Sequence, residues 1–84
     1  MDKKDQKTKE SFAVKNSLLS YRITREGEEV ILFGEELSGG EMCYSKTLVF
    51  SSDEEEKVRK FYRILIDSRT FPQMMEELAE EFFI

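Results

Sequence analysis

The chain has 84 residues, a mass of 9.9 kDa and a net charge of −5, with 39% hydrophobic and 37% charged residues. A chain of this length forms one small core, to which its seven Phe and three Tyr contribute much of the apolar area. It contains no histidine and one cysteine, so it lacks the commonest general base and cannot form an intrachain disulfide. We therefore predict that it is not an enzyme and has no catalytic, metal-binding or cofactor-binding residues.

The first eleven residues differ from the rest of the chain. After Met1 they contain no apolar side chain, so ordering them would cost conformational entropy without burying surface. The sequence predicts a disordered tail over 1–11 and a single α+β domain over 12–84. The apolar runs fall far short of the about 20 residues of a membrane helix, and a lone cysteine fits a reducing compartment. We expect a cytoplasmic protein that does not contact a membrane.

The first predicted strand is marked by strict alternation. Leu19, Tyr21 and Ile23 alternate with polar residues, which is the period of a strand that buries one face. Phe12 and Val14 either continue this strand or pack beside it.

Two further strands follow. A turn at Gly27 leads to a strand over 29–37, with the separation that a hairpin requires. Residues 30–33 of this strand are all apolar, so apolar side chains point to both of its faces. This is typical of a strand covered on both faces, although so short a chain can hardly cover both. Gly34 indicates a bulge in this strand. After a glycine pair, a third strand covers 42–50.

Two helices complete the chain. Ser52 and Glu55 have the spacing of a capping box, and the first helix ends near Ser68 because Pro72 disfavours helical geometry before it. Each helix has an apolar stripe at helical spacing. The fold class predicted from this order is α+β, with a three-stranded antiparallel sheet (β-β-β) followed by two helices packed on one face.

The charges are segregated along the chain. Residues 26–56 contain ten acids and one base, a balance of −9, whereas residues 57–72 contain five bases and one acid, a balance of +4. Acids also belong at turns and helix starts for stability alone. The functional alternative is an acidic inhibitor that mimics nucleic acid and binds a nucleic-acid-binding enzyme, as an anti-defence protein of phage type would. Its candidate partner-binding residues are Glu28, Glu29, Glu54 and Glu56.

The basic segment gives a third hypothesis, direct binding of nucleic acid by Arg59, Lys60 and Arg63. We do not favour it because domains that bind phosphates usually carry a net positive charge. These side chains fit a solvated helix face paired with carboxylates.

The second helix is the other candidate surface. Its stripe either belongs to the core or binds a protein partner or a second copy of the chain. The candidate residues are Met74, Met75, Leu78, Phe82 and Phe83. From these features we predict a small interaction or regulatory protein that binds a protein partner through the edge of the sheet, the second helix or both.

The order of these features also resembles a known family. Tyr21-x-Ile23, Ser52-x-x-Glu55 and Phe71-Pro72 are similar to motifs of a family of short bacterial proteins classed as a domain of unknown function. The resemblance spans 18–84, with Arg22 and Glu81 standing where the family commonly has glycine and aspartate. It implies a small bacterial cytosolic protein and no activity.

Overall fold

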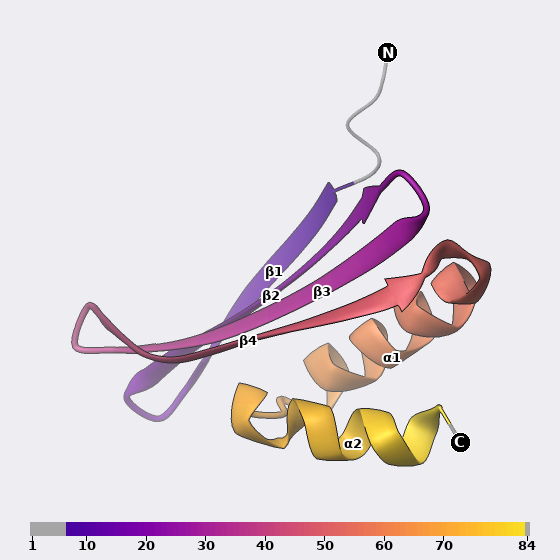
Figure 1. The fold of residues 1–84 in the computed structure, drawn as a ribbon. Coiled ribbons are helices and arrows are strands. Elements are labelled where there is room, and N and C mark those ends of the chain that lie inside the picture. The colour runs from indigo at the N-terminus through magenta and orange to yellow at the C-terminus, as the bar shows by residue number, and fades with distance from the viewer. Residues whose placement is uncertain (1–6, 84) are drawn as a thin grey trace.

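The computed structural model describes residues 7–83, which form one antiparallel sheet and two helices (Figure 1). The strands lie in the sheet in chain order, and a hairpin joins each to the next. They are β1 (Lys7–Val14), β2 (Ser17–Glu26), β3 (Glu29–Ser38) and β4 (Glu41–Ser51). The α+β class and the antiparallel sheet are confirmed, whereas the predicted number of three strands is wrong, because the sheet has four.

The additional strand is β1, which includes residues that the sequence assigns to a tail. Its backbone pairs with β2 over its full length, from Lys7 opposite Thr24 to Val14 opposite Ser17. An edge strand is held by backbone hydrogen bonds on one side, so even the polar run 7–11 can form one. Residues 7–11 are thus strand instead of the predicted tail, and residues 1–6 lie outside the described residues.

Gly34 on β3 does not form the predicted bulge. It pairs in unbroken register with Tyr21 on β2 and with Lys46 on β4. The irregularity lies further along β3, between Glu36 and Leu37, where β4 contributes one extra residue. Gly34 instead leaves room for the Tyr21 ring, whose Cε1 would lie 2.7 Å from a Cβ at position 34.

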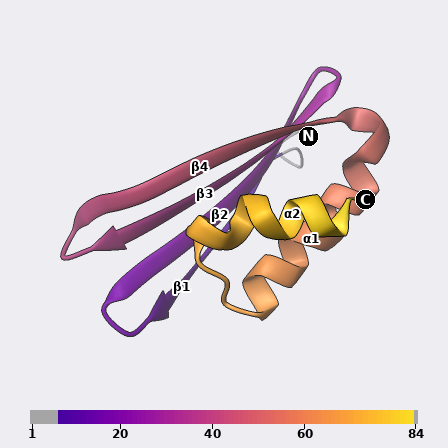
Figure 2. The ribbon, with the colours of Figure 1, turned by 60° about the horizontal axis from the view of Figure 1, so that its bottom comes forward.

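The helical part lies against one face of the sheet (Figure 2). It consists of the short 3₁₀ turn η2 (Ser52–Glu54), α1 (Glu55–Asp67), the 3₁₀ turn η3 (Pro72–Met74) and α2 (Met75–Phe82). The residue that caps this segment is Ser51, whose Oγ accepts a hydrogen bond from the Asp53 amide at 3.2 Å, and not the predicted Ser52. The 3₁₀ turn therefore moves Glu55 from the predicted capping box to the first position of α1.

The core lies between the sheet and the helices. It combines alternate residues of β2 and β3 with the apolar stripes of both helices, as the alternation and the helical spacing predict. Each such side chain contributes roughly 1.5–3 kcal/mol when fully buried. The largest fully buried side chains are Tyr21, Phe61, Leu19, Ile23, Leu32, Leu65 and Met75.

Glu55 joins the sheet to the first helix. Its carboxylate accepts hydrogen bonds from Arg25 Nη1 at 2.5 Å and from Arg59 Nε at 3.0 Å. The bond from Arg59 is the main cause that lowers the pKa of Glu55 below its ordinary value of 4.5. The stabilisation is therefore complete above about pH 4.5 and is lost as the pH falls through the lowered pKa.

This ion pair predicts a pH-dependent effect of Glu55→Gln. At pH 7 the variant should lose less than about 1 kcal/mol of unfolding free energy, because the three side chains are partly exposed to solvent. The difference from wild type should shrink below pH 4.5 as the wild-type carboxyl becomes protonated. Urea denaturation at a series of pH values measures it. A difference that is constant down to the lowest pH would show that the loss does not come from the carboxylate charge.

Candidate functional site

The apolar candidate residues of α2 mostly face the core. Met75 is fully buried, and Leu78, Phe82 and Phe83 are partly buried against the core. The Phe83 ring stacks on Phe50 of β4 with centroids 4.7 Å apart. A partner that meets this helix from outside would therefore contact Met74, which is 46% exposed, and the open edges of the aromatic rings.

The acidic candidate residues come together at one end of the sheet. Glu28 and Glu29 lie at the β2–β3 turn, and Glu54 and Glu56 lie at the start of α1; all four are exposed. A hydrogen bond from the Ser52 amide to the Glu28 carbonyl, at 2.9 Å, holds the two segments side by side. The inhibitor hypothesis that depends on these residues stays a prediction.

The basic residues of α1 are largely paired. Arg59 contacts Glu55, and Arg63 contacts Glu10 at 2.8 Å and Asp67 at 3.6 Å. Lys60 is exposed. Two of the three side chains considered for phosphate binding thus already have carboxylate partners.

Within residues 7–83, the remaining groups of chemical interest are one cysteine and the carboxylates. The Cys43 thiol is exposed on β4. In the same residues no group of Cys, Asp and Glu is arranged to hold a metal ion, and neither helix is long and apolar enough to span a membrane.

The helices cover one face of the sheet and leave the other face open. Side chains alternate between the two faces along a strand. The residues next in sequence to Leu19, Ile23 and Leu32 therefore point to this open face. Three of the five large apolar side chains exposed in the described part of the chain lie on it. They are Leu18, Met42 and Val49.

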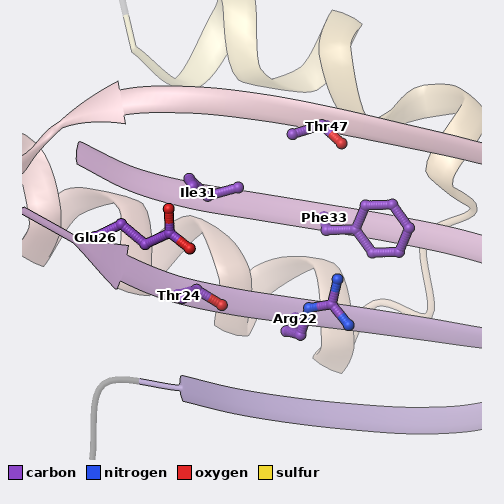
Figure 3. A pocket seen from close by; sticks show the side chains of 6 residues that line it. All are labelled: Arg22, Thr24, Glu26, Ile31, Phe33 and Thr47. Atoms are coloured by element: carbon purple, nitrogen blue, oxygen red, sulfur yellow. The ribbon is translucent and has the colours of Figure 1, made fainter.

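A hollow of about 300 Å³ lies on the open face across β2, β3 and β4 (Figure 3). Ile31 and Phe33 of β3 form its apolar part, and Arg22 of β2 lies beside Phe33 with its guanidinium carbon 4.8 Å from the ring centroid. This is the geometry of a cation–π contact. Arg22 has no ion-pair partner among the described residues. Thr24, Glu26 and Thr47 complete the lining of the hollow, which therefore combines the apolar surface of Ile31 and Phe33 with polar side chains and the charges of Arg22 and Glu26.

The open face was not among the candidate sites predicted from the sequence, although one signal pointed to it. Residues 30–33 place apolar side chains on both faces of the strand, and the helices cover only Val30 and Leu32. Ile31 and Phe33 remain on the uncovered side. A strand with apolar side chains on both faces leaves one set uncovered when the chain can cover only one face. Such an uncovered set indicates a binding surface.

These features define an α+β protein with a four-stranded antiparallel meander, two helices on one face and an open face of mixed apolar and polar side chains. Comparisons with protein-family models, with curated proteins and with solved structures find no match for this chain.

Proposed function

We propose that the chain is a non-enzymatic interaction protein that binds a protein partner through its open sheet face. The observation that carries this proposal is that Ile31 and Phe33, both half-buried, lie on a sheet face without helices, in a hollow that polar side chains surround. With strands of 8 to 11 residues, four strands about 4.8 Å apart give a face of about 600 Å². That area is of the order of the ~800 Å² that one partner contributes to a standard interface.

Arg22 indicates the chemistry of the partner. Its guanidinium lies on the Phe33 ring at the centre of the face, and this contact reduces its exposure to solvent. A carboxylate of the partner placed opposite Arg22 would therefore form a stronger ion pair than at a fully exposed site. The partner surface that fits is apolar and contains an Asp or Glu facing Arg22.

Affinity capture with matched variants tests this proposal. Leu18 on the open face and Met74 at the start of α2 are 41% and 46% exposed, so Leu18→Asp and Met74→Asp introduce the same charge at equally exposed apolar sites. We expect Leu18→Asp and Arg22→Glu each to weaken capture of a partner from the source cells at least about tenfold, because each introduces a carboxylate on the face from which the partner would exclude water. Met74→Asp should capture as wild type does, and thermal unfolding controls for folding.

Three results would contradict the proposal. Loss of the partner from Met74→Asp alone would move the binding surface to α2. Specific capture that is unchanged by all three variants would exclude both surfaces. Concentration-dependent dimers in sedimentation that Leu18→Asp abolishes would assign the open face to a second copy of the chain.

A further inference from the structure

The second edge of the sheet, formed by β4, offers a backbone to which another strand can be added. β4 has a neighbour on one side only, is 11 residues long and contains no proline. Long edges pair with other chains unless charges or bulges block them. The irregularity of β4 lies near its start, between Met42 and Tyr44, and its register with β3 is unbroken from Tyr44 to Ser51. The one lysine of β4, Lys46, does not block the edge, because it is directed to the helix side and pairs with Glu76 at 2.9 Å.

A groove runs along the same edge, between β4 and α2. The Lys46–Glu76 ion pair marks one end, and the stacked rings of Phe50 and Phe83 mark the other. α2 therefore runs beside β4 over this stretch, as Figure 1 also shows. A hollow of about 270 Å³ lies between them. It is also lined by Val49, whose side chain belongs to the opposite face, so it opens at the outer edge of the strand.

The groove has an apolar part and an acidic rim. Leu48, Ala79 and Phe83 supply apolar surface, whereas Glu76 and Glu80, one helical turn apart, supply carboxylates. Glu80 forms no ion pair with any described residue. Glu76 is paired with Lys46, and Lys57 lies over the Phe83 ring, 5.5 Å from its centroid. Among the described residues, Glu80 therefore supplies the unpaired negative charge of the groove.

These charges bear on which occupant fits. α2 carries four glutamates and no base, so pairing of β4 with β4 of a second copy would bring two acidic helices to the same seam. Like charges across an interface disfavour such a partner. A strand with basic side chains on the helix side has the opposite effect.

We propose that the β4 edge binds an extended segment of a partner protein by strand addition, with an apolar residue in the groove and a Lys or Arg two positions away facing Glu80, next to the Lys46–Glu76 ion pair. Residues i and i+2 of an added strand point to the same side, about 6.6 Å apart. That spacing lets one side chain reach Leu48 and Phe83 while the other reaches the Glu80 carboxylate. Backbone hydrogen bonds would supply affinity, and the two side chains would supply specificity. This surface is separate from the open face of the proposed function.

Selection from a displayed library of random peptides of about seven residues, the length of a typical strand, tests this inference. We expect selected peptides to contain an aliphatic or aromatic residue two positions from Lys or Arg. In ¹⁵N spectra, a selected peptide should shift amides of β4 and leave those of β1 unchanged.

Two charge reversals on α2 form the matched comparison. Glu80 lines the groove, whereas Glu77 is exposed on the same helix and does not line it. Glu80→Lys should weaken binding of the selected peptide about fivefold, because an exposed attraction becomes a repulsion. Glu77→Lys should leave the affinity for the same peptide within a factor of two of wild type, because Glu77 does not line the groove.

Several results would overturn the inference. These are the absence of enriched peptides, enrichment of acidic ones, equal weakening by both reversals, or shifts confined to the open face. Dimerisation through β4 amides, seen by sedimentation and amide protection, would show that the edge pairs with a second copy. Leu18→Asp tests the open face independently, so failure of one proposal leaves the other standing.

Discussion

Replacing Met75 by alanine is expected to lower the free energy of unfolding by about 3 kcal/mol, within the range for large-to-small core substitutions. Met75 is fully buried and belongs to the cluster that includes Tyr21 and Leu65. Truncation would remove buried apolar area and leave a cavity between α2 and the sheet. A domain of this size has a total stability of only about 5–10 kcal/mol, so the loss is a large part of it.

The adjacent methionine supplies the control. Met74 is 46% exposed, and Met74→Ala should change the free energy of unfolding by no more than about 0.5 kcal/mol, as surface substitutions usually do. Urea denaturation followed by far-UV circular dichroism compares the two variants. Equal losses for both, or no loss for Met75→Ala, would mean that α2 does not pack on the sheet as described.

The two methionines also show what helical spacing can predict. The stripe of α2 was recognised from the sequence, but a stripe that includes adjacent residues does not say which of them faces inward. The entry angle of the helix decides this, and it depends on the 3₁₀ turn at Pro72 that precedes α2. Packing of this kind arises from contacts between distant segments, which a local pattern does not contain.

Strand β1 illustrates a different limit. β2, β3 and β4 were predictable because their apolar alternation reports a buried face. β1 has polar residues over most of its length, and the turn that joins it to β2 has no glycine, although Lys15 adopts a φ of 56° there. Asn16 in this turn is a residue that favours turns, but residues 7–11 before it show no apolar alternation, so no periodic pattern marks the strand. The pairing depends on backbone groups that every sequence carries.

The open face was partly foreseeable for a physical reason. The apolar run 30–33 indicated a strand with two apolar faces, and chain length indicated that only one could be covered. What the sequence could not supply was the register that places Arg22 opposite Phe33. The candidate site is a product of pairing between strands, so its composition becomes visible only when the register is known.

Gly34 shows how a single position couples the sheet to the helices. The glycine lies directly opposite Tyr21, a ring with no exposed surface whose hydroxyl donates a hydrogen bond to the Thr70 carbonyl in the segment between the helices. A Cβ at position 34 would lie 2.7 Å from Cε1 and 2.9 Å from Cδ1 of this ring. The ring cannot move aside without losing its hydrogen bond or its packing against the helices.

We therefore expect Gly34→Ala to lower the free energy of unfolding by about 2 kcal/mol, as overpacked cores do. Backbone entropy alone would favour alanine by roughly 0.5–1 kcal/mol, so the sign of the measured change decides whether the close approach to Tyr21 dominates. In a Tyr21→Leu background the steric conflict is removed, and Gly34→Ala should become neutral or stabilising. Urea denaturation of the four proteins of this double-mutant cycle should give a coupling free energy of about 2 kcal/mol. A coupling near zero would refute the role assigned to Gly34, because the two positions would then act independently.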